Sequence, residues 1–184
     1  MKICLIGDCC GKTSIVQRWI TPTQNIRDES TIAVEMKTIS IVIDNKCRRI
    51  QMWDCSGDRG YRTLLDKYIF NAHVIAVCFD LTSLSSWLIA QQWIDRTRSI
   101  TDAPICIIGN RVDLESRRQV KEKDVKTFIE ILAHDLMFYC ETSALTGENC
   151  IETLHMICRE GSRDKKVYTL DDFKPPPKDK CTFM

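Results

Sequence analysis

Three features that mark other protein classes are missing from this chain of 184 residues. Its 11 cysteines never occur as C-x-x-C, so the spacing of a structural zinc site is absent. Basic and acidic residues number 26 and 25, and a net charge of +1 gives no electrostatic reason to expect a nucleic-acid partner. The longest apolar run, AHVIAVCF, is too short to cross a bilayer. Because a single lysine precedes the first apolar run at Ile3, we expect no secretory leader and a cytoplasmic setting.

Short apolar segments alternate with amphipathic ones along most of the chain. The apolar segments predict strands at 2–7, 73–80, 103–110 and 137–144, and the amphipathic segments predict helices at 12–20, 85–100, 122–136 and 149–160. Segments 31–44 and 47–54 alternate polar and apolar residues around Asn45 and Lys46, which predicts a hairpin. This order indicates an α/β fold built from βαβ units on a mostly parallel sheet. We expect one folded domain over residues 1–161 and an extended, Pro-containing tail over 162–184.

The segment GDCCGKTS, residues 7–14, nearly matches a phosphate-binding loop. The usual pattern is G-x-x-x-x-G-K-[ST]. Here only Asp8, Cys9 and Cys10 separate Gly7 from Gly11, so the loop is one residue short. A shortened Gly-rich loop is weak evidence of a nucleotide site when it stands alone.

Three further polar segments lie at the ends of predicted strands. Asp54 and Gly57 lie in WDCSG, Asn110 and Asp113 lie in GNRVD, and residues 141–144 read ETSA. Taken singly, an aspartate or asparagine in such a place is equally consistent with an ordinary turn or cap. In an open α/β sheet, however, ligands bind at the carboxyl ends of the strands. We therefore expect these segments and the Gly-rich loop to converge on one site.

In this order, the motifs resemble those of Ras-superfamily small GTPases, and most closely those of the Rab-like branch. GDCCGKTS corresponds to the phosphate loop, STIAVEMK to switch I, WDCSGDRGYRTL to switch II, and NRVD with ETSA to the guanine motifs. Eighteen residues separate Lys12 from Thr31 and 22 separate Thr31 from Asp54, as in typical Rabs. The resemblance covers roughly residues 2 to 160. It implies the P-loop NTPase fold of small G proteins, with a six-stranded, mostly parallel sheet, one antiparallel strand, and helices on both faces.

The resemblance assigns a phosphate and metal half to the site. GTP or GDP would bind through its phosphates to the loop and the start of the following helix, with Lys12 against the β- and γ-phosphates; these residues are Asp8, Cys9, Cys10, Gly11, Lys12, Thr13 and Ser14. Mg²⁺ would be held by Thr13, Thr31 and Asp54, with Thr31 joining only when a γ-phosphate is present. The Gly57 N–H would contact the γ-phosphate.

The guanine half would be built from the two remaining motifs. Asp113 would accept from the base N1–H and amino group, which excludes adenine because the wrong base leaves the carboxylate without a partner. Asn110 would fix the phosphate loop, and the Ala144 N–H would contact the guanine oxygen. Arg111, Ser143 and Leu145 complete the predicted set.

Several residues depart from the family pattern. Asp58 stands where a glutamine orients the attacking water, and a carboxylate there repels the γ-phosphate, so intrinsic hydrolysis should be slow. Gln24 replaces an aromatic that packs on guanine, Leu145 replaces a lysine, and Arg111 replaces another lysine whose stem covers the base. We expect looser nucleotide binding in consequence. The adjacent thiols of Cys9 and Cys10 beside a helix N-terminus also raise the hypothesis of a redox switch.

The last four residues, CTFM, fit a C-a-a-X prenylation signal at Cys181. A single lipid gives only reversible attachment, here to the cytosolic face of membranes. The resemblance also implies an exchange factor, a GTPase-activating protein and effectors that bind the switch regions of a monomer.

Two functional hypotheses follow. The first is a Rab-like switch in membrane and vesicle trafficking that hydrolyses GTP slowly. The second is a non-hydrolysing interaction module that occupies or sequesters trafficking partners and uses nucleotide as a structural cofactor. An adenine-specific P-loop enzyme is a remote third class, which the NRVD and ETSA motifs disfavour.

Overall fold

A computed structural model describes residues 1–22, 31–43, 45–132 and 137–162. Six strands form one sheet in the order β2-β3-β1-β4-β5-β6. The strands are β1 (Lys2–Ile6), β2 (Val34–Ile43), β3 (Lys46–Cys55), β4 (Val74–Asp80), β5 (Ile105–Asn110) and β6 (Met137–Thr142). Only the β2–β3 pairing is antiparallel. The predicted sheet, with its single antiparallel strand, is therefore confirmed.

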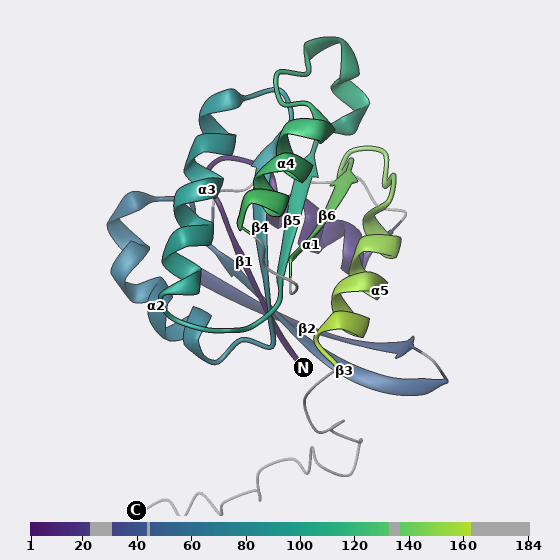
Figure 1. Cartoon of the computed structure of the whole chain (residues 1–184). Coiled ribbons are helices and arrows are strands. Elements are labelled where there is room, and N and C mark those ends of the chain that lie inside the picture. The colour runs from purple at the N-terminus through teal and green to yellow at the C-terminus, as the bar shows by residue number, and fades with distance from the viewer. Residues whose placement is uncertain (23–30, 44, 133–136, 163–184) are drawn as a thin grey trace, which may run out of the picture.

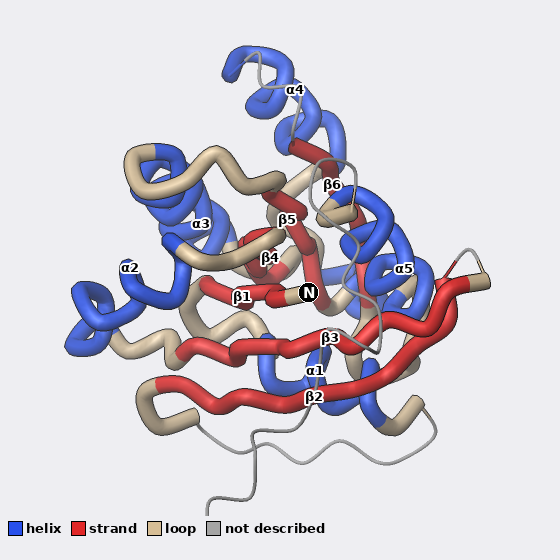
Figure 2. Tube along the Cα trace, turned by 90° about the horizontal axis from the view of Figure 1, so that it is seen from below, coloured by secondary structure: helices blue, strands red, loops and turns tan. Residues whose placement is uncertain are grey.

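Helices cover both faces of the sheet (Figures 1 and 2). They are α1 (Lys12–Ile20), α2 (Arg62–Phe70), α3 (Leu84–Arg98), α4 (Glu122–Leu132) and α5 (Cys150–Glu160), with short 3-10 turns η1 (Arg59–Tyr61) and η2 (Val112–Arg117). Because side chains alternate along each strand, β1 sends Ile3 and Leu5 into a core with α1 and α5, and Cys4 and Ile6 into a core with α2, α3 and α4. All seven residues of β4 are buried, as expected for a central parallel strand.

Most cysteines act as small apolar residues. Eight of them are buried in the two cores: Cys4, Cys10, Cys55, Cys78, Cys106, Cys140, Cys150 and Cys158. Cys9 and Cys47 are exposed.

The hairpin and the fourth helix differ slightly from the predicted ranges. β2 begins at Val34 rather than residue 31, because the chain around Thr31 turns toward the ends of the parallel strands, with Ala33 at a φ of 57°. The described part of α4 ends at Leu132, and residues 133–136 of the predicted helix lie outside the described residues. The tail also lies outside them beyond residue 162, so the predicted boundary at 161 stays a prediction. Among the described helices, none is long and apolar enough to cross a membrane.

Candidate functional site

Two adjoining cavities lie at the carboxyl ends of the strands. The larger, of about 670 Å³, is lined by residues 9–14 together with Thr31, Ile32, Cys55, Ser56, Gly57, Asp58, Tyr61 and Arg111. The smaller, of about 250 Å³, is lined by Gly11, Ser14, Asn110, Arg111, Asp113, Leu114, Ala144 and Leu145. Because Gly11, Ser14 and Arg111 line both, the two cavities form one continuous site. The four predicted segments converge there.

The shortened loop between β1 and α1 keeps a tight turn. Gly7 has a φ of 134°, Cys9 of 48° and Gly11 of 78°, so three of five successive residues have positive φ. A Cβ on Gly7 would lie 2.1 Å from the Cys78 carbonyl oxygen, which excludes any side chain there. The loop also separates the two thiols, because Cys9 faces solvent and Cys10 is buried.

The start of α1 faces the larger cavity. The first N–H groups of a helix have no intrahelical partner, and no described side chain caps this helix. Such an end suits a phosphate. Lys12 is 7% exposed and donates from Nζ to the Gly7 carbonyl oxygen at 2.6 Å. Burial alone would lower the pKa of Lys12, but Cys10, Cys78, Asp54 and Asp8 around it raise that pKa above its ordinary value. The ammonium is therefore charged and held beside the loop.

Asp8, the first residue after Gly7, turns away from the cavities. Its Oδ2 accepts from Arg62 at the start of α2 at 3.3 Å, and its Oδ1 accepts from Trp93 Nε1 of α3 at 3.2 Å. Asp8 therefore ties the loop to two helices, and it lines neither cavity.

Three oxygen-bearing side chains meet beneath α1. Thr13 Oγ1 lies 2.7 Å from Thr31 Oγ1 and donates to Asp54 Oδ2 at 2.5 Å, while Thr31 Oγ1 donates to the same oxygen at 3.1 Å. Asp54 Oδ1 is buried and has no hydrogen-bond partner within the described part of the chain. Burial raises the pKa of Asp54, although the two threonine hydroxyls oppose that shift. Two hydroxyls and a carboxylate with a spare oxygen fit Mg²⁺, which prefers such hard donors.

Asp58 is exposed and bonded within its own turn. Its Oδ1 accepts from the Gly60 N–H at 2.8 Å, and its N–H donates to Ser56 Oγ at 3.2 Å. The carboxylate therefore caps η1 at the edge of the larger cavity. Gly57 packs against the loop, since a Cβ there would lie 3.1 Å from Asp8 Cα.

Asn110 joins the two halves of the site. It is 2% exposed, its Nδ2 donates to the Cys10 carbonyl oxygen at 2.9 Å, and its Oδ1 accepts from the Ala144 N–H at 3.1 Å. The Ala144 N–H, expected from the family resemblance to contact guanine, donates to Asn110 in this structure. Asp113 Oδ1 is buried without a hydrogen-bond partner among the described residues. It can therefore accept a hydrogen bond from a ligand in the smaller cavity.

The two loop residues beside Ala144 play different parts. Ser143 is buried and its Oγ accepts from the Thr146 N–H at 3.0 Å, so it shapes the loop. Leu145 is 71% exposed and lines the smaller cavity.

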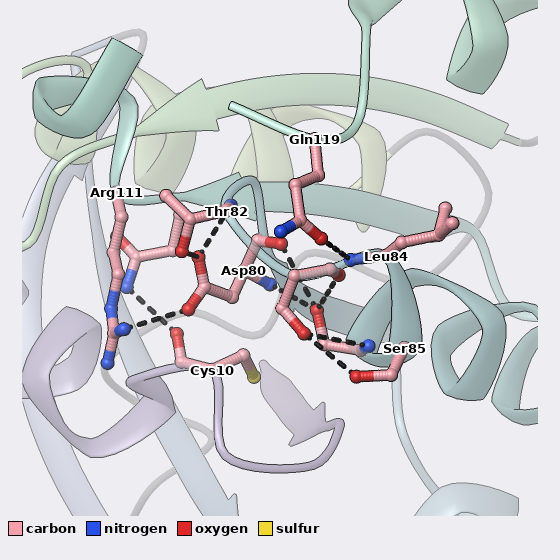
Figure 3. A network of polar contacts seen from close by, with 10 residues as sticks. Cys10, Asp80, Thr82, Leu84, Ser85, Arg111 and Gln119 are labelled. Atoms are coloured by element: carbon pink, nitrogen blue, oxygen red, sulfur yellow. Dashed lines mark hydrogen bonds and ion pairs between the residues drawn. The ribbon is translucent and has the colours of Figure 1, made fainter. Parts of the chain in front are cut away.

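Arg111 is anchored by a residue that the sequence analysis did not identify. Arg111 has a φ of 71°, and its Nη1 donates to Asp80 Oδ2 at 2.8 Å (Figure 3). Asp80 Oδ1 in turn accepts from the N–H and hydroxyl of Thr82 at 2.8 and 2.7 Å. The guanidinium is thereby held at the junction of the two cavities. Asp80 ends a predicted strand just as Asp54 does, and that parallel was the signal available in the sequence.

Arg18 of α1 was also missed, because nothing local in KTSIVQRWI marks it; its contacts are described below. Gln24 and Cys181 lie outside the described residues.

Comparison with known proteins identifies the family. The Ras family model matches residues 2–163. Ras-related protein RABA4d of Arabidopsis thaliana is 34% identical over 176 residues, which cover 93% of this chain and 78% of the relative. Ras-related protein Rab11B of Nicotiana tabacum is 35% identical over 151 residues, 80% of this chain and 68% of the relative. The Ras and EF-hand domain-containing protein of Danio rerio is 31% identical over 170 residues, 90% of this chain and 26% of the relative. The chain therefore belongs to the Ras family, as a Rab-like small GTPase.

Proposed function

We propose that this protein is a guanine-nucleotide switch that binds GTP and GDP with Mg²⁺, hydrolyses GTP slowly, and acts in membrane trafficking. The observation that carries the proposal is the meeting of Thr13, Thr31 and Asp54 beside the start of α1. In the adjoining cavity, Asp113 Oδ1 has no hydrogen-bond partner among the described residues. One group of oxygens suits a metal at the phosphates, and the other suits a guanine edge.

The two threonines give the site a means to distinguish GTP from GDP. Thr13 is fixed in α1, whereas Thr31 stands before β2 in the chain that leads into the hairpin. Thr31 reaches the site through its hydroxyl contacts to Thr13 and Asp54. A γ-phosphate and its Mg²⁺ would stabilise this placement, and its loss would release the segment. When bound, Mg²⁺ neutralises charge on the phosphates.

Hydrolysis should be slow because this chain offers no neutral amide at position 58. The Asp58 carboxylate already accepts from the Gly60 N–H. While ionised it cannot donate a hydrogen bond, and its charge opposes that of the γ-phosphate. A GTPase-activating protein that brings its own catalytic groups would relieve the defect.

The remaining parts of the proposal follow from the family. The switch regions would bind an exchange factor, a GTPase-activating protein and effectors, and the chain would act as a monomer. Prenylation of Cys181 would attach it reversibly to the cytosolic face of membranes. The names of the relatives support a Rab-like role and specify no compartment.

The bound nucleotide decides between the switch and the interaction module. Denatured protein extract, separated by ion-pair chromatography, should contain GTP or GDP at close to one equivalent. GDP would support turnover, whereas GTP would support a site that binds tightly and has stalled at Asp58. No nucleotide, with no binding of added GDP in Mg²⁺, would contradict the switch and favour the module that only occupies partners.

A further inference from the structure

Residues 143–147 form a loop that lines the smaller cavity, which we call the base cavity under the proposed function. One arginine, Arg18, holds this loop through hydrogen bonds. Arg18 lies in the last turn of α1 and is 8% exposed. Its Nε donates to the Ala144 carbonyl oxygen at 2.9 Å and its Nη2 to the Leu145 carbonyl oxygen at 2.6 Å. Both residues line the base cavity. A single planar guanidinium thus fixes two successive peptide groups of this loop.

The Arg18 side chain also contacts the segment that follows α1 and precedes switch I in the sequence. Arg18 Nη1 donates to the Pro22 carbonyl oxygen at 2.5 Å. The loop also wraps the guanidinium, since a Cβ on Gly147 would lie 3.5 Å from Arg18 Cδ. Three carbonyl oxygens from two separate segments therefore converge on one buried cation.

These contacts close a ring that joins the phosphate and base halves of the site. The phosphate loop runs into α1, α1 carries Arg18, and Arg18 holds the peptide groups of Ala144 and Leu145. The Ala144 N–H donates to Asn110 Oδ1, and Asn110 Nδ2 donates back to the Cys10 carbonyl oxygen of the phosphate loop. Protein contacts therefore hold the base loop at a fixed separation from the phosphate loop.

We propose that Arg18 is a positioning residue for the guanine base: it fixes the loop 143–147 on α1 so that the base cavity is formed before nucleotide binds. This inference rests on the proposed function, because it names how that site selects its base. A rigid loop matters here, since burial of a base against pre-placed groups avoids the entropy of ordering them on binding. Arg18 touches no nucleotide and acts through the loop.

The test compares a guanine with an adenine nucleotide. Arg18→Gln removes the charge and the paired N–H donors that bind the Ala144 and Leu145 carbonyl oxygens, and Arg18→Lys keeps the charge but not the planar donor pair. Both variants keep a polar side chain. With Mg²⁺ present, the dissociation constant for GDP should rise about tenfold or more, because one charge-assisted hydrogen bond is worth at least that factor. ADP should bind weakly, and its dissociation constant, measured by competition, should stay unchanged because the base loop does not stabilise bound adenine. Selectivity for GDP over ADP should therefore fall by the same factor.

Arg98→Gln is the matched control. Arg98 Nη1 donates to the Ala103 carbonyl oxygen at 3.1 Å, beside the amino end of β5 and so at the opposite end of the sheet from the site. Its loss should leave both dissociation constants unchanged. Equal weakening of GDP and ADP by Arg18→Gln would show a merely structural role and overturn the inference, as would no change in either.

Hydrogen exchange without added nucleotide separates this inference from the proposed function. Amides of residues 143–147 should exchange faster in Arg18→Gln than in the unmodified protein, while β4 amides do not change. If the unmodified protein binds no GDP, the proposed function fails, and unchanged exchange at 143–147 would then overturn the inference by itself. If Arg18→Gln does not fold, Arg18→Lys, which keeps the charge, carries both measurements.

Discussion

The Asp58 carboxylate caps η1, and under the proposed function it also occupies the position from which a glutamine would orient water. The first role stabilises the turn, and the second is chemically unsuited to an anion. Asp58→Gln should raise the intrinsic rate of GTP hydrolysis roughly tenfold or more, because a neutral amide can both accept from water and donate to the phosphate. Single-turnover hydrolysis in Mg²⁺ measures this rate.

Asp58→Asn is the informative comparison for that change. It removes the charge and keeps an oxygen that can accept from the Gly60 N–H. A small rate increase in Asp58→Asn would measure the effect of removing the negative charge. A larger increase in Asp58→Gln would show that the longer side chain is also needed for the amide to reach the attacking water. If neither variant hydrolyses GTP faster, Asp58 is not what limits turnover.

Thr31 provides a second test at the scale of one side chain. Thr31→Ala removes a hydroxyl that bonds Thr13 and Asp54. A ligand at 100 times its dissociation constant stabilises a protein by about 2.7 kcal/mol. In Thr31→Ala the extra stabilisation by a non-hydrolysable GTP analogue over GDP should fall by about 1 kcal/mol or more, as the loss of a hydrogen bond implies. Thermal melting with each nucleotide and Mg²⁺ measures the difference.

The control for Thr31→Ala is Thr38→Ala on β2. Thr38 donates to Met36 Sδ and its contact is exposed. That variant should keep the full difference between the two nucleotides. Equal differences in Thr31→Ala and the unmodified protein would refute a γ-phosphate role for Thr31.

Residue identities alone predicted most of the residues that gather around the two cavities, and they missed the contacts that hold those residues in place. Asp54, Asn110 and Asp113 were singled out because each lies at or just after the end of a strand, in a fixed order. Arg18 and Asp80 were missed because their partners, Ala144 and Arg111, are far away in sequence. Side-chain contacts between residues far apart in sequence leave no periodic or motif signal, so only the folded structure reveals them.

Among the secondary elements, continuous and alternating hydrophobicity were reliable guides. The uninterrupted run of β4 predicted a strand buried on both faces, and the alternation of β2 and β3 predicted the hairpin. The helix α2 was not predicted. The turns η1 and η2 were not predicted either, because three to six residues are too few to show a helical period. Both turns stand next to the site, where local hydrogen bonds override propensity.

The link between η2 and β6 yields a prediction about acid stability. Arg118 donates from Nη1 and Nη2 to the two carboxylate oxygens of Glu141 at 2.9 and 2.7 Å, and Tyr139 donates to Glu141 Oε1 at 2.6 Å. Burial alone would raise the pKa of Glu141, but these hydrogen bonds hold that pKa below its ordinary value. The carboxylate therefore stabilises the fold above about pH 4.3, and this contribution is lost as the pH falls through the lowered pKa.

Glu141→Gln should lower the free energy of unfolding at pH 7 by about 2 kcal/mol, because a charge-assisted pair becomes neutral. The deficit should shrink as the pH falls below about 4.3 and through the lowered native pKa of Glu141, because the native carboxylate then becomes protonated as well. Urea unfolding from pH 3 to pH 7 measures it. Glu115→Gln is the control, since that partner of Arg118 is largely exposed and its pair contributes little. A pH-independent deficit in Glu141→Gln would contradict the linkage.

At the scale of the whole molecule, the parts of the site lie together at the carboxyl ends of the parallel strands. The ends of β1, β3, β5 and β6 supply the phosphate loop, Asp54, Asn110 and the base loop. The departures at positions 58, 111 and 145 lie on the cavity walls, whereas the cores beneath them are filled by ordinary apolar residues. The fold is thus conventional, and these departures gather at the proposed nucleotide site, so we expect turnover and affinity to differ from the family more than stability does.

The proposed membrane attachment through Cys181 can be tested by substitution in the tail. Cys181→Ser should shift the protein in eukaryotic cells to the soluble fraction, because it removes the only acceptor in CTFM. Met184→Leu favours the longer geranylgeranyl chain, and each further buried CH₂ adds about 0.8 kcal/mol, so its membrane fraction should exceed that of the unmodified protein. Cys158→Ser would perturb a buried thiol in α5, so Cys47→Ser, at an exposed thiol in β3, is the control and should fractionate normally. Identical fractionation of Cys181→Ser and the unmodified chain would exclude prenylation as the anchor, and partners of the switch regions would then have to recruit the protein.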